Sequence, residues 1–166
     1  IVHRDLKPEN VMAYAGTALI IDFGISKSGQ TGVRTAAGVI LGTPGYIAPE
    51  AVREEPVTGG SDIYALGVTF FELLTGVRPL QRVDAEDPTS TRTRMEELLA
   101  MRDVTPPAPS ALAPDCPRWV DALVERMLAT NPLERPMWSE VAEEITHCLR
   151  PRITEQTIRS LPAMAS

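Results

Sequence analysis

Apolar and polar residues follow two different patterns along the 166-residue chain, one before and one after residue 47. In the first part the apolar runs are short, and two of them, NVMAY and TALII, flank Ala15-Gly16. Short apolar runs on either side of a two-residue turn signal are typical of a β-hairpin. From Ala48 onward the apolar residues recur at helical spacing instead. We therefore expect a mainly α-helical α+β chain, with short β-strands at its beginning followed by a helical bundle.

Three helices are expected in the second part. The first follows Ser61, a candidate N-cap, ends near Gly76 and is apolar on most sides, which predicts a central position. Its apolar positions are Ile63, Leu66, Phe70, Leu73 and Leu74. The second begins near Pro117 and the third lies in SEVAEEITHCL, and both show amphipathic helical spacing. Their apolar positions are Val120, Leu123, Val124, Met127 and Leu128, and then Val141, Ala142, Ile145 and Leu149.

Three other stretches carry weaker patterns. Residues 105–117, TPPAPSALAPDCP, are rich in proline and follow neither a helical nor a strand period, which favours an irregular connector. A weaker amphipathic segment, RMEELLAMR, precedes this connector. Residues 151–166 are polar and poorly periodic, so we expect one domain over residues 1–150 and a tail over residues 151–166.

Composition narrows the possible functions. The net charge of −6 argues against nucleic acid as a partner, because that role needs Lys and Arg gathered on one face. Cys116 and Cys148 form no Cys-x-x-Cys motif, which indicates neither a disulfide framework nor a zinc site and favours the reduced cytoplasm. The most apolar run contains Glu72 and is shorter than the roughly 18 to 20 residues of a membrane helix. We expect no membrane segment, and we interpret the start at Ile1, without Met, as that of a fragment.

Three short motifs in a fixed order indicate the chemistry. The chain has HRDLKPEN at residues 3–10, DFG at residues 22–24 and APE at residues 48–50. These match the H-R-D-L-x-x-x-N, D-F-G and A-P-E motifs of protein kinases. A single aspartate in a loop is more often a turn residue or a helix cap, but the joint spacing of three motifs is a strong signal. The chain therefore resembles the C-terminal, large lobe of a bacterial-type serine/threonine protein kinase over about residues 1–150.

The resemblance implies roles in phosphoryl transfer, which requires positioned groups and neutralised charge on the phosphate oxygens. Asp5 would accept or orient the proton of the substrate hydroxyl. Asn10 and Asp22 would hold Mg²⁺ together with ATP, because this cation prefers oxygen ligands. Lys7 would place a positive charge near the transferred phosphate, and Thr43 would contact both Asp5 and Lys7. In the family, a lysine at this place goes with serine/threonine rather than tyrosine substrates.

Other matched residues are expected to support the structure. The resemblance implies that His3 packs beneath Phe23, next to Gly24, and is not a catalytic base. Asp62 would bind the backbone of the His3-Arg4 turn, although an aspartate in a first helical turn is also favourable through capping and the helix dipole alone. Glu50 and Arg135 match a buried ion pair of the family, whereas a pair of surface charges would contribute little.

The segment between residues 24 and 42, ISKSGQTGVRTAAGVIL, is rich in small and hydroxyl-bearing residues. We interpret it as an activation loop. Thr35 is the first candidate for phosphorylation, followed by Thr31 and Ser28, and Arg4 could pair with a phosphate there. The alternative is a solvated loop that is not phosphorylated.

A complete kinase also has a Gly-rich loop, a strand lysine and a glutamate paired to that lysine, and none of these is found in the chain. We therefore expect the isolated chain to bind ATP weakly and to lack activity. Completed by an N-terminal lobe, it would phosphorylate Ser or Thr hydroxyls of proteins. A small-molecule phosphotransferase is disfavoured by the matches at Arg4 and Glu50. A non-catalytic, kinase-like scaffold would ordinarily show damage at Asp5, Asn10 or Asp22.

Overall fold

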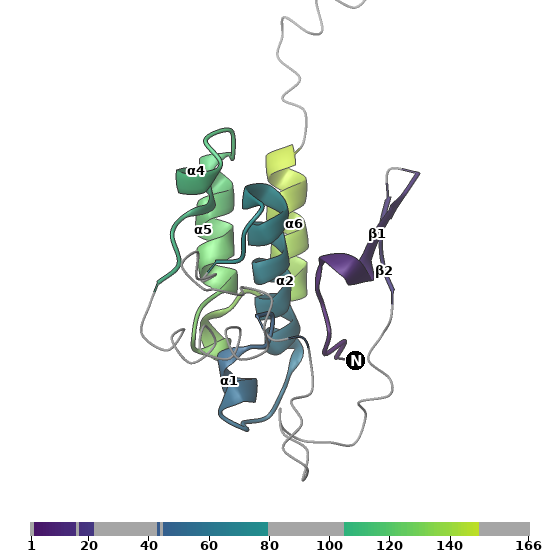
Figure 1. The fold of residues 1–166 in the computed structure, drawn as a ribbon, viewed down its shortest axis with the longest axis vertical. Helices are drawn as coiled ribbons and strands as arrows, with labels where there is room; N and C mark the ends of the chain where they lie inside the picture. Colours follow the sequence, from purple (N-terminus) through teal and green to yellow (C-terminus); the bar gives the residue numbers. More distant parts are fainter. Residues whose placement is uncertain (1, 16, 22–42, 44, 80–104, 150–166) are drawn as a thin grey trace, which may run out of the picture.

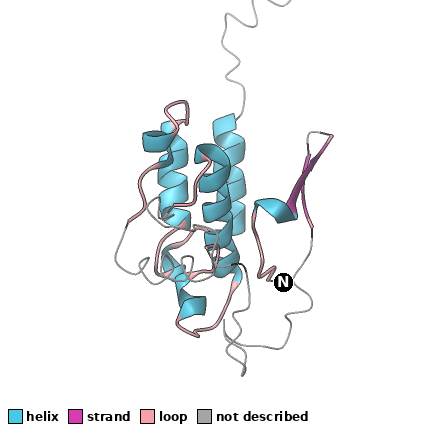
Figure 2. Ribbon diagram, viewed as in Figure 1, coloured by secondary structure: helices cyan, strands magenta, loops and turns pink. Residues whose placement is uncertain are grey.

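The computed structural model describes residues 2–15, 17–21, 43, 45–79 and 105–149. Within these ranges the protein is mostly helical, as expected, with one two-stranded sheet near its beginning (Figures 1 and 2). The elements are the 3-10 helix η1 (Pro8–Asn10), β1 (Val11–Tyr14), β2 (Thr17–Ile20), α1 (Pro49–Val52), α2 (Gly59–Thr75), α4 (Pro109–Leu112), α5 (Arg118–Met127), the 3-10 helix η3 (Pro132–Glu134) and α6 (Trp138–Leu149).

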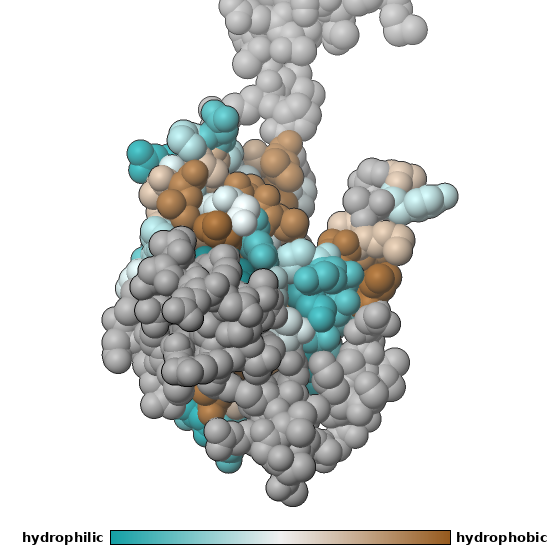
Figure 3. All heavy atoms as spheres, in the orientation of Figure 1, coloured by the Kyte–Doolittle hydropathy of each residue, from teal (hydrophilic) through white to brown (hydrophobic). Residues whose placement is uncertain are grey.

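The strands β1 and β2 form the predicted hairpin. They pair antiparallel, with Val11 opposite Ile20 and Tyr14 opposite Thr17, so the connection is the two-residue turn expected from the sequence. In this turn Ala15 has a φ of 48°, the left-handed conformation that such tight hairpin turns require. The hairpin projects away from the helices in Figure 1, and its apolar side chains form part of the surface in Figure 3.

Helix α2 begins three residues earlier than the sequence indicates. Thr58 is the N-cap, because its hydroxyl accepts a hydrogen bond from the amide of Gly60 at 3.2 Å. Ser61 is instead the third helical residue, and its hydroxyl accepts from the amide of Thr58 at 3.1 Å. These two bonds form a capping box, in which a side chain three residues inside the helix completes the cap. The helix ends at Gly76 as predicted, where a φ of 78° suits glycine.

The core lies around α2, which confirms its central position. Tyr64, Val68 and Phe71 are buried in one apolar cluster with residues of α5, and Ile63 is buried in a second cluster with Leu123, Met127 and Val141. The second cluster joins α2 to both α5 and α6, which stand beside it in Figure 1. Burial of these side chains supplies the main favourable free energy that holds the helices together.

Some predicted apolar positions lie on the surface. Leu73 and Leu74, in the last turn of α2, are 62% and 41% exposed. In α6 only Val141 is buried among the predicted apolar positions, Ile145 is half-buried, and Ala142 and Leu149 are exposed. Helical periodicity identifies an apolar face, but the neighbouring elements decide how much of that face is covered.

The proline-rich segment 105–117 is more ordered than the sequence indicates, because it contains the short helix α4. Pro109 is its first residue, a position where a missing amide hydrogen costs no hydrogen bond. The amide and hydroxyl of Ser110 both donate to the carboxylate of Asp121 in α5, at 2.9 and 2.6 Å. These two bonds lower the pKa of Asp121 and fasten α4 to α5.

Two of the expected segments, RMEELLAMR and the tail over residues 151–166, lie outside the described residues. Across the part of the chain that the structure describes, no helix combines the length and the apolar character needed to cross a membrane.

Candidate active site

The aspartate of α2 anchors the loop that contains the first motif. The carboxylate of Asp62 accepts hydrogen bonds from the backbone amides of His3, at 2.6 Å, and Arg4, at 2.9 Å. Asp62 is only 4% exposed. Arg4 has a φ of 69°, a left-handed conformation that is strained for a residue with a side chain. The two charge-assisted bonds hold this turn in place, so α2 determines where Asp5 lies.

The side chains of Asp5, Lys7 and Thr43 meet, although Thr43 is 38 positions after Asp5. The hydroxyl of Thr43 donates to Oδ1 of Asp5 at 3.2 Å and accepts from Nζ of Lys7 at 2.8 Å. Lys7 Nζ also lies 3.7 Å from Oδ2 of Asp5. The arrangement places a carboxylate, an ammonium group and a hydroxyl within reach of one another at a partly exposed site.

The buried side chains of Asn10 and His3 both form hydrogen bonds to the backbone of Asp5. The side-chain amide of Asn10, which is 6% exposed, donates to the backbone oxygen of Asp5 at 2.7 Å. The ring of His3 accepts from the amide of Asp5 through Nδ1 at 3.3 Å, so Nε2 carries the proton towards the backbone oxygen of Ile21 at 3.2 Å. The buried imidazole therefore joins the loop to the end of the hairpin, a structural contact.

Of the two residues expected to hold Mg²⁺, the structure describes Asn10. Because the amide nitrogen of Asn10 is bound to the backbone of Asp5, its amide oxygen is the atom that remains to ligate a cation. Amide and carboxylate oxygens are the ligands that Mg²⁺ prefers. Among the described residues there is no group of three His, Cys, Asp or Glu side chains that could hold a metal ion. Asp22, Phe23, Gly24 and the candidate phosphorylation sites Ser28, Thr31 and Thr35 lie outside the described residues.

Glu50 and Arg135 form a buried, bidentate ion pair. Nη1 and Nη2 of Arg135 donate to Oε1 and Oε2 of Glu50 at 2.7 and 2.8 Å, and both side chains are at most 1% exposed. Burial alone raises the pKa of Glu50, but the hydrogen bonds from Arg135 and Ser61 outweigh it and hold this pKa below its ordinary value. The guanidinium also lies 5.0 Å from the ring centre of Tyr64, a cation–π distance.

Two contacts near the site were missed by the sequence reasoning. The hydroxyl of Ser61 donates to Oε1 of Glu50 at 2.7 Å, and the hydroxyl of Tyr46 donates to a carboxylate oxygen of Glu72. Burial, and next this bond to Glu72, raise the pKa of Tyr46. A signal for the second contact was present, because Glu72 interrupts an apolar helix, where a charged residue needs a polar partner.

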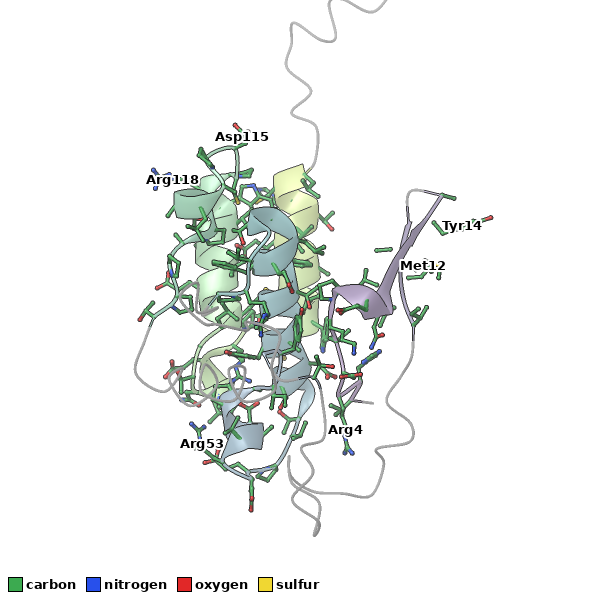
Figure 4. The ribbon with its side chains drawn as sticks, viewed as in Figure 1. Arg4, Met12, Tyr14, Arg53, Asp115 and Arg118 are labelled. Carbon is green, nitrogen blue, oxygen red and sulfur yellow. The ribbon has the colours of Figure 1, made fainter. Side chains whose placement is uncertain are left out.

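Arg4 lies on the surface. Its side chain is exposed and extends downwards from the loop in Figure 4, to the right of the helices. The pairing of Arg4 with a phosphorylated threonine stays a prediction, because the segment that carries the candidate sites lies outside the described residues.

Comparison with known proteins places these features in a family. Residues 1–146 match the protein kinase domain. The chain is 38% identical over 136 residues to the serine/threonine-protein kinase PknA of Mycobacterium tuberculosis, covering 81% of the chain and 29% of PknA. It is 35% identical over 151 residues to the serine/threonine-protein kinase pkn3 of Myxococcus xanthus, covering 84% of the chain and 26% of pkn3. It is also 35% identical over 136 residues to the tyrosine-protein kinase MasK of Myxococcus xanthus, covering 81% of the chain and 20% of MasK.

The chain thus spans less than a third of the length of each of these relatives. The kinase motifs and the match over residues 1–146 lead to the same conclusion: this chain belongs to the protein kinase family.

Proposed function

We propose that this chain is the large lobe of a serine/threonine protein kinase, which transfers the γ-phosphate of ATP to a hydroxyl of a protein substrate when an N-terminal lobe completes it. The observation that carries the proposal is the contact of Thr43 with Asp5 and Lys7. Asp5 and Lys7 belong to a loop that Asp62 anchors to α2. A binding scaffold has no need for a carboxylate and an ammonium group held together at a partly exposed site.

In this proposal Asp5 is the group that orients the substrate hydroxyl and accepts its proton. Thr43 holds the Asp5 carboxylate through Oδ1, and Lys7 supplies positive charge beside it. Phosphoryl transfer spreads negative charge over the phosphate oxygens, and the ammonium group of Lys7 stabilises that charge. Asn10 and Asp22 would hold Mg²⁺, which neutralises phosphate charge when it is bound together with ATP.

The choice of Ser or Thr as the acceptor rests on Lys7 and its bond to Thr43, together with the names of two relatives. A third relative is named a tyrosine-protein kinase. The acceptor is therefore best tested directly, with matched peptides that differ only in Ser, Thr or Tyr. We also propose a cytoplasmic location, which is supported by the free thiols of Cys116 and Cys148.

The decisive experiment compares the chain alone with the chain joined to the N-terminal lobe of a bacterial protein kinase. We expect phosphate transfer from radiolabelled ATP only in the joined protein. Asp5→Asn should lower this transfer by about 100-fold or more, because no neighbouring group replaces the carboxylate. Asp115→Asn, in an exposed turn at the far end of the helices (Figure 4), is the matched control and should leave the rate unchanged.

Two outcomes contradict the proposal. Transfer at the wild-type rate by the joined Asp5→Asn protein removes Asp5 from the reaction. Micromolar binding of Mg-ATP by the isolated chain, measured by calorimetry, shows that the nucleotide site does not depend on the N-terminal lobe.

A further inference from the structure

Ser61 lies between the buried ion pair and the residue that anchors the catalytic loop. Its hydroxyl donates to Oε1 of Glu50 at 2.7 Å and accepts from the amide of Thr58 at 3.1 Å. The next residue is Asp62, whose carboxylate binds the amides of His3 and Arg4. Ser61 is 7% exposed, so water does not replace these bonds easily.

Both members of the ion pair bind the first turn of α2. The Oε1 atom that accepts from Ser61 also accepts from Nη1 of Arg135 at 2.7 Å. The same Nη1 donates to the backbone oxygen of Gly60 at 2.9 Å. Residues 60 and 61 are thus attached to the Glu50–Arg135 pair through one hydrogen bond each, immediately before Asp62.

We propose that Ser61 is a positioning residue, which transmits the position of the Glu50–Arg135 pair to Asp62 and thereby to the loop that carries Asp5. The inference rests on the proposed function in that it treats this loop as catalytic. The physical reason is the strain at Arg4, whose φ of 69° the Asp62 carboxylate helps to hold through the bond to its amide. A small shift of the first turn of α2 lengthens both bonds to the loop.

A plain capping role is the competing explanation, and the chain offers a control for it. Thr58 forms the other half of the capping box through its bond with the amide of Gly60, but no bond joins its side chain to Glu50 among the described contacts. Loss of the Thr58 side chain therefore weakens the cap alone. Thr69 provides a second control, because its buried hydroxyl in the same helix bonds only to the backbone oxygen of Ala65 among the described contacts.

The experiment measures amide hydrogen exchange in the complete 166-residue chain by nuclear magnetic resonance. The exchange rates of the His3 and Arg4 amides are each divided by the exchange rate of the Leu123 amide, which belongs to a buried residue of α5. A variant that destabilises the whole fold raises all of these rates alike and leaves the ratio unchanged. We expect Ser61→Ala to raise this ratio about five- to tenfold, which is the effect of losing one ordinary hydrogen bond. Thr58→Ala and Thr69→Val should leave the ratio unchanged.

A second pair of variants keeps the test decisive where Ser61→Ala weakens the whole fold. Ser61→Thr retains the hydroxyl and should exchange like the wild type. Ser61→Cys keeps the unbranched shape of the side chain but donates only weakly, and it should raise the ratio. An unchanged ratio in Ser61→Ala and Ser61→Cys overturns the proposal. An equal rise in Thr58→Ala also overturns it, because capping alone then explains the effect.

Amide exchange requires no phosphate transfer, so this test remains informative even where the proposed kinase activity is absent. In the joined, active protein the same role predicts that Ser61→Ala lowers kcat about five- to tenfold while the KM for ATP stays constant, since Ser61 positions the loop and not the nucleotide. A rise in KM with unchanged kcat contradicts the positioning role.

Discussion

Arg135 donates hydrogen bonds to both carboxylate oxygens of Glu50, a residue 85 positions earlier in the chain. The pair joins the segment before α6 to α1, and Arg135 also donates to the backbone oxygens of Ala129, Gly60 and Thr130. A buried guanidinium with this many acceptors is well compensated for its loss of water. Removal of either partner leaves the other charge buried without its counterpart.

Arg135→Ala should therefore lower the free energy of unfolding by about 3 to 5 kcal/mol. Urea denaturation of the two proteins measures the difference. The control is Arg53→Ala, because Arg53 pairs with Glu55 at the surface, and the change expected there is about 0 to 1 kcal/mol. Equal midpoints for Arg135→Ala and the wild type are incompatible with a buried pair.

Acid should weaken the fold partly through Glu50. Its pKa in the folded protein lies below the ordinary value of 4.5, which the unfolded chain approaches. The stabilisation from Glu50 is therefore complete above about pH 4.5 and is lost as the pH falls through the lower, folded value. We expect the stability difference between the wild type and Glu50→Gln to shrink below pH 4.5 in urea titrations. The surface variant Glu55→Gln is the control, and its free energy of unfolding should differ from the wild type by only about 0 to 1 kcal/mol.

Gly67→Ala should destabilise the protein, although alanine usually favours a helix interior over glycine by about 1 kcal/mol. A Cβ at Gly67 would lie 2.9 Å from Cβ of Met127 in α5 and 3.1 Å from Leu128, so the two helices must separate. The expected loss is about 1 to 3 kcal/mol, measured as a shift of the denaturation midpoint. A Cβ at Gly59 would lie 3.9 Å from Nε1 of Trp138, its nearest neighbour, so Gly59→Ala serves as the control. A stabilised Gly67→Ala protein contradicts close packing of α2 on α5.

The hydroxyl of Thr43 should be required for full catalytic rate, because it bonds to Asp5 and Lys7. Thr43→Val keeps the shape but removes the bonds to Asp5 and Lys7, and in the active, joined protein it should lower kcat by about tenfold to a hundredfold. Thr43→Ser retains the hydroxyl and should keep most of the rate. Steady-state kinetics on one peptide substrate compares the three proteins. Equal rates for Thr43→Val and Thr43→Ser mean that the hydroxyl does not position Asp5.

The sequence by itself determined the elements whose signals are local. Two apolar runs around a two-residue turn predicted the hairpin, and helical spacing predicted α2, α5 and α6. The order and spacing of three motifs also predicted the family. These elements can be predicted from the sequence because turns and amphipathic faces depend on residues only a few positions apart.

Beyond the distant contacts that the kinase resemblance implied, the tertiary structure alone decided which distant groups meet and which apolar residues are covered. No pattern in the sequence predicts the bond from Ser61 to Glu50, and the interruption of the apolar helix at Glu72 does not say that Tyr46 is the partner. Leu73 follows the helical pattern and yet is 62% exposed. The physical reason is that burial and hydrogen bonding between elements depend on how helices pack in space, whereas periodicity records only the face that each helix can offer.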